Sequence, residues 1–135
     1  MTLLNGKKRL EMNGKLVDVN ILIYLSKRKL ELEKITAPGV ILSISVITYM
    51  EVLGFKFEDN SEKYIIEQLC KYFPVTGLNQ EVVDKVIAIR QQHKIKLPDA
   101  IILATAIISD MELVTANVTD FIHIEPRLKI YNPMI

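Results

Sequence analysis

Short apolar runs alternate with longer helical patterns along almost the whole chain, and this alternation constrains the fold more than any other feature of the sequence. Runs suited to buried strands occur at residues 16–19, 40–45, 73–76, 113–115 and 128–131. Apolar residues at helical spacing predict helices at 20–30, 46–55, 62–72, 79–93 and 99–109, and a short one near Phe121. Strands that alternate with helices form parallel sheets covered on both faces. We therefore expect an α/β fold built on a doubly wound parallel sheet.

Local signals indicate where several helices begin and end. Ser45 and Asn79 are expected to cap the helices that follow them, and Gly54 to end the helix after Ser45. Pro98 fits the first turn of its helix. The basic residues 27–29 are expected to lie at the carboxyl end of the first helix, where positive charge complements the helix dipole.

The size of the chain favours one domain over residues 1–135, large enough to bury a core without disulfides. Half of the residues are hydrophobic, which excludes a disordered chain. The longest apolar run, near residues 100–108, is too short for a membrane span, and we expect no membrane association. Cys70 is the only cysteine, which excludes a disulfide framework and fits a core residue in a reducing cytoplasm.

Seventeen basic residues against sixteen acidic ones leave a net charge of +1. A protein that coats nucleic acid would carry a large positive charge, so any contact with nucleic acid must be local. Lys94 and Lys96 are candidates for such a contact, because they immediately precede Asp99. His93 lies beside these lysines and is read with them as part of the same contact, although a lone histidine is more often an ordinary residue than a metal ligand or proton shuttle, as we expect for His123. Residues 27–29 are read rather as a solvated helix end.

Four acids lie where apolar residues would be expected: Asp18, Glu51, Asp99 and Asp120. Structural explanations exist for three of them. Asp99 suits the first turn of a helix, Asp120 could cap a helix, and Glu51 could face water. Asp18 lies in an apolar run with no evident cap signal, and a buried carboxylate must be paired, protonated or metal-bound.

The predicted fold brings these four acids to one place, because ligands of open parallel sheets bind outside the carboxyl ends of the strands. Carboxylates that converge repel each other unless a cation lies between them. Hard oxygen ligands of this kind suit Mg²⁺ or Mn²⁺. Such a site can catalyse phosphoryl-group chemistry with one or two metal ions.

Four segments resemble the motifs of PIN domains, and of the VapC-type toxin ribonucleases among them. VDVNILIYL resembles the opening signature, SVITYMEVLGF the second acidic helix, KLPDAIILATAI the third acidic motif and LVTANVTDF the closing segment. The segments occur in the order and at the spacing of the family, over residues 16–131. The resemblance implies a five-stranded sheet in the order 3-2-1-4-5.

The resemblance further implies a Mg²⁺- or Mn²⁺-dependent endoribonuclease, usually a homodimer, which a small antitoxin protein silences. Asp18, Glu51, Asp99 and Asp120 would be its catalytic and metal-binding acids. Three polar residues would support them: Asn20, Thr115 and Asn117. Asn117 is an alternative to Asp120 as the fourth metal ligand.

The sequence departs from the family pattern at two positions. Val19 replaces a small hydroxyl residue that could orient Asp18, and Ala116 replaces a residue that could contact substrate. A catalytically degenerate PIN domain that acts as a binding module therefore remains an alternative. A phospho-acceptor receiver domain is disfavoured, because the third strand ends without an aspartate. Residues 1–11 precede the first motif and are expected to be an N-terminal extension that is not needed for folding, with Met12 as an alternative start.

Overall fold

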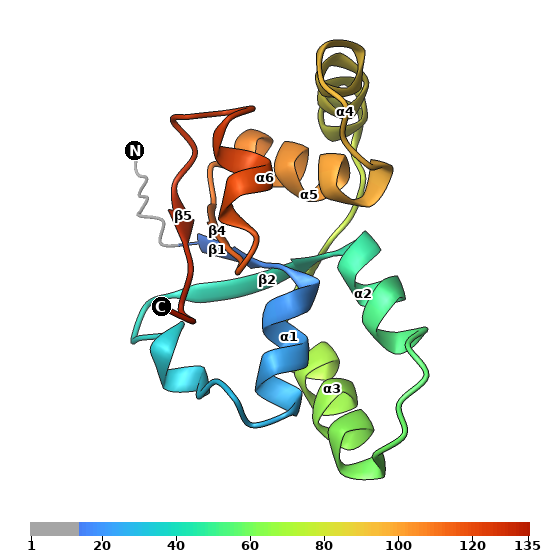
Figure 1. Ribbon diagram of the computed structural model, residues 1–135, viewed down its shortest axis with the longest axis vertical. Coiled ribbons are helices and arrows are strands. Elements are labelled where there is room, and N and C mark those ends of the chain that lie inside the picture. The colour runs from blue at the N-terminus through green and yellow to red at the C-terminus, as the bar shows by residue number, and fades with distance from the viewer. Residues whose placement is uncertain (1–13) are drawn as a thin grey trace, which may run out of the picture.

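The computed structural model describes residues 14–135, and the expectation for residues 1–11 lies outside this range. Five parallel strands form one sheet in the order β3-β2-β1-β4-β5 (Figure 1). The strands are β1 (Gly14–Val17), β2 (Ile41–Ser45), β3 (Val75–Thr76), β4 (Glu112–Val114) and β5 (Ile130–Tyr131). Every neighbouring pair is parallel, which confirms the predicted fold class and strand order.

Helices cover both faces of the sheet (Figure 1). They are α1 (Val19–Ser26), the 3₁₀ turn η1 (Leu32–Lys34), α2 (Val46–Leu53), α3 (Asn60–Tyr72), α4 (Gln80–Gln92), α5 (Leu97–Ile108) and α6 (Val118–Ile122). Of the helices between residues 14 and 135, none is both long and apolar enough to cross a bilayer.

The core consists of two clusters, one on each face of the sheet. Successive residues of a strand point to opposite faces, so Leu16 and Leu113 pack with α4 and α5, whereas Val17 and Val114 pack with α1 and α3. Cys70 is buried in the second of these clusters, as the sequence predicts. Burial of both faces explains why the central strands read as continuous apolar runs.

The predicted caps of two helices are confirmed. The Ser45 hydroxyl accepts a hydrogen bond from the backbone N–H of Ile47 at 3.1 Å, and the Asn79 side chain accepts one from Val82 at 2.9 Å. Gly54 ends α2, and Pro98 lies in the first turn of α5. These caps fix the directions in which α2 and α4 leave the carboxyl edge of the sheet.

The first strand and helix differ from the prediction. β1 ends at Val17 and α1 begins at Val19, so Asp18 lies between them as the N-cap of α1. α1 ends at Ser26, with no basic residue in its last turn. The basic residues 27–29 instead form the turn that follows α1, because Arg28 adopts a left-handed conformation with φ of 60° that ends the helix.

The short elements also differ in their bounds. β3 and β5 contain two residues each, and Phe73 ends α3 rather than belonging to a strand. α3 begins at Asn60 after the cap Asp59, and α5 begins at Leu97. α6 begins at Val118, so Asn117 rather than Asp120 occupies the cap position.

Candidate functional site

Asp18 is held in one orientation by its neighbours at the carboxyl end of β1. Its backbone N–H donates to the carbonyl of Val114 in the adjacent strand at 3.0 Å. One carboxylate oxygen accepts a hydrogen bond from Val19 N at 2.7 Å, and the other accepts from Thr115 Oγ1 at 2.8 Å and from Asn20 Nδ2 at 3.2 Å. The residue is only 3% exposed. The expectation that no cap signal attends Asp18 was wrong, since the side chain caps α1.

Asn20, Thr115 and Asn117 join the start of α1 to the loop that follows β4. The Asn20 carbonyl oxygen accepts from Ala116 N at 3.0 Å, and its amide donates to Thr115 Oγ1 at 3.3 Å. Thr115 Oγ1 also accepts from Asn117 N at 2.9 Å. These bonds orient Asp18 without the hydroxyl that Val19 replaces.

Burial raises the pKa of Asp18, and the negative charge of Asp99 raises it further. The hydrogen bonds from Thr115, Val19 and Asn20 oppose this rise, because they stabilise the charged form. A buried carboxylate that keeps three donors around it is therefore prepared to carry a negative charge, at a cost that a nearby cation would offset.

The charge of Asp99 affects the pKa of Asp18, and the charges of Asp18 and Asp99 both affect the pKa of Glu51. Desolvation raises the pKa of Glu51, and the charges of Asp18 and Asp99 add to the effect. The pKa of Asp99 is also raised, by desolvation and by Asp120, whereas Lys96 lowers it. Three helices thus bring these acids into one neighbourhood: Asp18 caps α1, α2 carries Glu51 and α5 carries Asp99.

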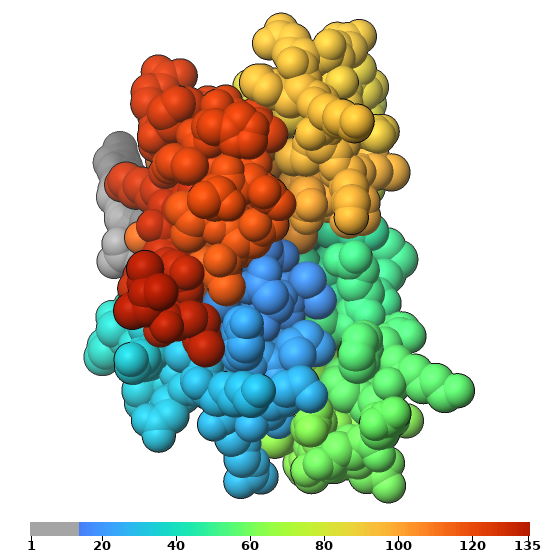
Figure 2. Space-filling model, in the orientation of Figure 1, coloured from blue at the N-terminus to red at the C-terminus, as the bar shows by residue number. Residues whose placement is uncertain are grey.

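Asp120 lies at the periphery of this group. It is exposed in the first turn of α6, and its carboxylate accepts a hydrogen bond from Asn117 Nδ2 at 2.9 Å. Its charge reaches Asp99, while no effect on Asp18 or Glu51 is resolved. On the face drawn in Figure 2, the start of α1 (blue) lies where the segments that carry the other three acids meet (green, amber and orange-red).

The carboxylate oxygens of these four acids are of the type that binds a hard divalent cation, although the side chains lie too far apart to hold one without moving. Between residues 14 and 135, no three acidic, histidine or cysteine side chains are close enough to hold an ion as they stand. Glu51 and Asp120 are exposed and have room to rotate, whereas Asp18 is fixed. Mutual repulsion of unneutralised carboxylates favours such a separation.

A buried hydroxyl next to Glu51 adds to this fit. Thr48 lies one turn before Glu51 on α2, is fully buried, and its Oγ1 has no hydrogen-bond partner in the described part of the chain. In a helix interior a threonine hydroxyl bonds to the carbonyl four residues earlier, but that residue here, Ile44, lies in β2. A buried hydroxyl of this kind calls for a water molecule or an ion beside it. Thr48 is not among the residues predicted from the sequence, although it lies three residues before Glu51.

The two lysines predicted to contact RNA are placed differently. Lys96 precedes α5 and is close enough to lower the pKa of Asp99. Lys94 lines a groove of about 520 Å³ beside α4, together with Arg90, His93 and Ile95. His123 is exposed, and its Nδ1 lies 3.0 Å from the carbonyl of Thr119. Neither histidine contributes to the shifted titration of the acids.

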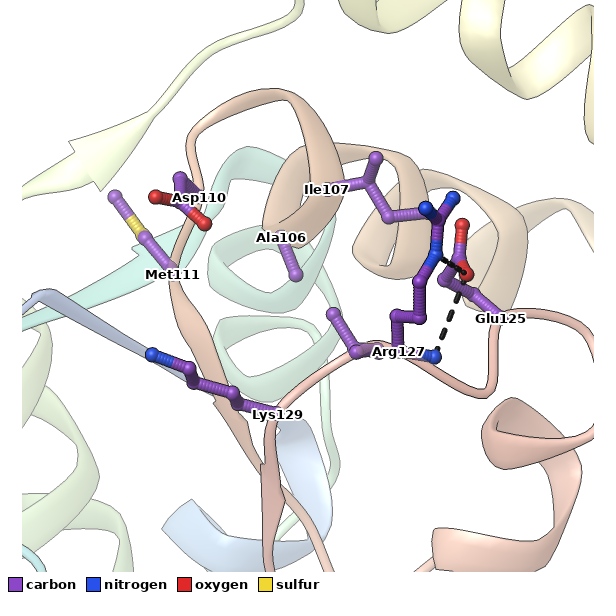
Figure 3. Close-up of a pocket in the computed structure, with 8 residues that line it drawn as sticks. Ala106, Ile107, Asp110, Met111, Glu125, Arg127 and Lys129 are labelled. Atoms are coloured by element: carbon purple, nitrogen blue, oxygen red, sulfur yellow. Dashed lines mark hydrogen bonds and ion pairs between the residues drawn. The ribbon is translucent and has the colours of Figure 1, made fainter.

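Another cavity, of about 310 Å³, lies at the opposite end of β4 (Figure 3). Its wall contains charges of both signs, and two of them pair with each other. Glu125 Oε2 lies 3.5 Å from Arg127 Nε and accepts a hydrogen bond from the Arg127 backbone N–H. Lys129 and Asp110 also line the cavity. This balance gives the cavity no preference for one sign of ligand charge.

Comparison with known proteins agrees with the geometry. The PIN domain family model matches residues 15–125. A chain of a toxin–antitoxin complex from Klebsiella pneumoniae is 33% identical, with a TM-score of 0.68, and the alignment covers 88% of this chain and 97% of that one. No curated protein gives a significant match.

Two further solved structures show the same fold. A chain of VapBC-1 from nontypeable Haemophilus influenzae is 24% identical, with a TM-score of 0.70. The alignment covers 90% of this chain and 99% of that one. A chain of VapBC2 from Rickettsia felis, in a structure bound to a promoter DNA fragment, is 18% identical, with a TM-score of 0.75. The alignment covers 88% of this chain and 98% of that one. The protein described here belongs to the PIN domain family. Its structural neighbours are chains of VapBC toxin–antitoxin complexes.

Proposed function

We propose that the protein is a metal-dependent endoribonuclease in which Asp18, Glu51, Asp99 and Asp120 hold Mg²⁺ or Mn²⁺. The observation that carries the proposal is the setting of Asp18: a carboxylate that is 3% exposed, held by three hydrogen bonds, and close to two other acids whose pKa is raised. A protein that used these acids for structure alone would pair them with Lys or Arg, and among residues 14–135 Lys96 is the only cation that shifts the pKa of Asp18, Glu51 or Asp99.

Each side chain has a role in this proposal. Asp18 is the fixed, buried ligand, the half-buried Asp99 is the second, and Glu51 and Asp120 complete the site by rotating from the rim. Asn117 holds Asp120 at 2.9 Å and thereby positions it, which favours Asp120 as the ligand and Asn117 as its support. The bound cation would activate water and stabilise the charge that develops on the phosphodiester.

Lys96 is placed to bind the phosphate of RNA beside the acids, since it already interacts with Asp99. Lys94, which lines the groove beside α4, would contact the RNA farther from the scissile bond. Single-stranded or loop RNA is the expected substrate, because the A-form duplex constrains the backbone. The lack of a hydroxyl at Val19 is weak support for the degenerate alternative, since Asp18 is oriented by the backbone N–H of Val19 and by the side chains of Asn20 and Thr115.

We further propose that the protein is the toxin of a toxin–antitoxin pair and acts in the cytoplasm. The 33% identity with a chain of a toxin–antitoxin complex supports an antitoxin partner. The exposed apolar side of α2 supports the same idea, because large apolar side chains in a cluster mark protein interfaces. The residues of this side, with the loop after it, are Tyr49, Met50, Leu53 and Phe55. A homodimer is expected as well, and light scattering of the purified protein tests it.

The nuclease activity is tested with a panel of structured RNAs. The wild-type protein should cut single-stranded regions in Mg²⁺ or Mn²⁺, and EDTA should stop the reaction. Asp99→Asn should reduce the rate by about two orders of magnitude or more, because metal electrostatics carries most of the transition-state stabilisation. Equal cleavage by both proteins would reveal a contaminating nuclease. If the wild type cleaved no RNA, the proposal would be wrong and the binding-module alternative would stand.

A further inference from the structure

A basic cavity lies at the other end of α1 from Asp18. Its volume is about 300 Å³, and its wall consists of the turn after α1, Lys34 of η1 and the residues after β5. Three cationic side chains, Arg28, Lys29 and Lys34, line it with a single acid, Glu31. Lys27, the neighbouring cation, is already paired with Glu62 at 3.0 Å and does not line the cavity.

The cations of this cavity form no ion pair with any residue that the structure describes. Within residues 14–135, the ion pairs involve other cations: Lys15, Lys27 and Arg127. The cavity differs in this respect from the one in Figure 3, where Arg127 and Glu125 pair with each other. Three cations around a concave surface, none of them in an ion pair with another residue of the range 14–135, favour an anionic ligand.

The backbone of the cavity is rigid. The N–H of Arg28 donates to Leu25 O at 3.1 Å, and the N–H of Lys29 donates to Tyr24 O at 2.9 Å. These two bonds and the φ of 60° at Arg28 define a Schellman turn, in which the position of Arg28 is usually glycine. The turn satisfies carbonyls at the end of α1, so fewer of them face the cavity and oppose an anion.

The far wall of the cavity is fixed to the sheet. The Tyr131 hydroxyl donates to Lys34 O at 3.1 Å, and Pro133 is buried. Met134 N donates to Asn132 Oδ1 at 2.9 Å in the same segment. In Figures 1 and 2 the carboxyl terminus (dark red) lies beside η1 (cyan). Little ordering is therefore needed when a ligand binds.

One wall of the cavity, formed by the residues after β5, lies at the same edge of the sheet as Asp18. Asp18 follows β1, Thr115 follows β4, and the residues 132–134 of the cavity wall follow β5, the next strand. Neighbouring strands are about 4.8 Å apart, which places the end of β5 about 10 Å from that of β1. α1, with eight residues, spans about 12 Å between Asp18 and the basic turn. A single strand of RNA crossing the acids can therefore reach the cavity within a few nucleotides.

We propose that Arg28, Lys29 and Lys34 bind backbone phosphates of the RNA strand a few nucleotides from the bond that is cleaved. This inference rests on the proposed ribonuclease function and extends it, since it assigns a second contact for the substrate. It gives Arg28 and Lys29, which belong to a stretch read from sequence as a solvated helix end, a role that depends on Lys34 beside them.

Binding of a fluorescent single-stranded RNA tests the proposal, measured by anisotropy with the full chain. The Asp99→Asn variant in EDTA keeps the RNA intact. In that background, Lys29→Ala with Lys34→Ala should weaken binding at least about tenfold at 0.1 M salt. The slope of log K against log salt should fall in magnitude by about 1.4, since each phosphate contact on a single strand contributes about 0.7.

The matched control removes two positive charges elsewhere. Arg127→Ala with Lys129→Ala changes the net charge equally, at the cavity of Figure 3. Its affinity should stay within about twofold of the parent protein, with the slope unchanged. Equal weakening by both double variants would mean that only net charge matters, and would overturn the proposal.

Arg28→Gly separates binding from folding. Glycine suits the left-handed position, so the melting temperature should rise while RNA affinity falls. A variant that is more stable and binds RNA as tightly as the parent would contradict a role for Arg28.

A poly-glutamate peptide of the same length as the RNA is the remaining comparison. If it bound as tightly and depended equally on Lys29 and Lys34, the cavity would be a general anion site and the proposal would be wrong.

These outcomes are distinct from a failure of the proposed function. If the wild type binds RNA through the cavity but cleaves none, the ribonuclease proposal falls and the phosphate contact stands. If the wild type cleaves RNA, and the slope of log K against log salt is the same with and without Lys29 and Lys34, the ribonuclease proposal stands and the cavity has no part in RNA binding.

Discussion

Thr115 Oγ1 donates a hydrogen bond of 2.8 Å to Asp18 Oδ2, and this bond joins the carboxyl ends of two adjacent central strands. Both residues are almost completely buried, at 0% and 3% exposure. The same oxygen of Thr115 accepts from Asn117 N, which orients the loop that precedes Asp120. The bond therefore fixes the most buried of the four acids and, through Asn117, the support of the exposed Asp120.

Replacing Thr115 with valine keeps the shape and removes this bond. Burial already raises the pKa of Asp18 and the bond lowers it, so Thr115→Val should raise the pKa further and weaken metal binding. The fold should lose about 1–3 kcal/mol, because a buried carboxylate and the Asn117 N–H lose a partner. Chemical denaturation measures the loss, and Thr115→Ser should restore both stability and metal binding. A valine variant as stable as the wild type would show that the bond is weak.

Glu51→Gln should have opposite effects on stability with and without metal. In EDTA the charge of Glu51 repels Asp18 and Asp99, so its removal should stabilise the fold by about 0.2–1 kcal/mol, as for other exposed charge pairs. In Mn²⁺ the variant should lose most of the rise in melting temperature that the wild type shows, since a ligand that binds only the native state stabilises it. Glu67→Gln, an exposed acid on α3, is the matched control and should keep the full rise.

The metal-dependent rise in melting temperature should depend on pH. The pKa values of Asp18, Glu51 and Asp99 are raised above the ordinary 3.8 for aspartate and 4.5 for glutamate, so protons compete with metal at unusually high pH. The rise should be small near pH 5 and largest near neutral pH. In EDTA these groups make the fold less stable, not more, as pH rises. A raised pKa means that the folded protein holds the proton more tightly than the unfolded chain does. Their contribution to stability is therefore full at low pH and is lost as pH rises through the pKa of the folded state.

Thermal melts from pH 5 to pH 8, with and without Mn²⁺, measure both effects. The Asp99→Asn variant is the control, because it removes one of the interacting carboxyls. A metal-dependent rise of equal size across this pH range would contradict the assignment of these acids as ligands.

The fold could be predicted from the sequence because the periods of the apolar residues are clear. Strands buried on both faces read as apolar runs, and Leu16 and Val17 pack on opposite faces accordingly. The boundary at Asp18 could not be read in this way. The apolar run continues from Val19 into α1, whose inner residues are as apolar as the strand, so nothing in the pattern marks the end of β1.

The candidate acids could also be predicted, because the carboxyl ends of parallel strands lie at one edge. Other features of the site depend on residues that are distant in the sequence. The orphaned hydroxyl of Thr48 follows from where β2 ends and α2 begins. The basic cavity requires the turn after α1 and the residues after β5 to meet, through the bond from Tyr131 to Lys34. No local pattern predicts such a meeting.

The most direct test of the central claim, that the four acids form one metal site, is the position of Mn²⁺ in crystals grown with that ion. The anomalous difference map should show a peak at coordination distance, about 2.1 Å, from carboxylate oxygens of Asp18 and Asp99. Glu51 and Asp120 should have rotated toward it, directly or through water. A map at saturating Mn²⁺ with no peak beside Asp18, or with its strongest peak at another group of residues, would contradict the account.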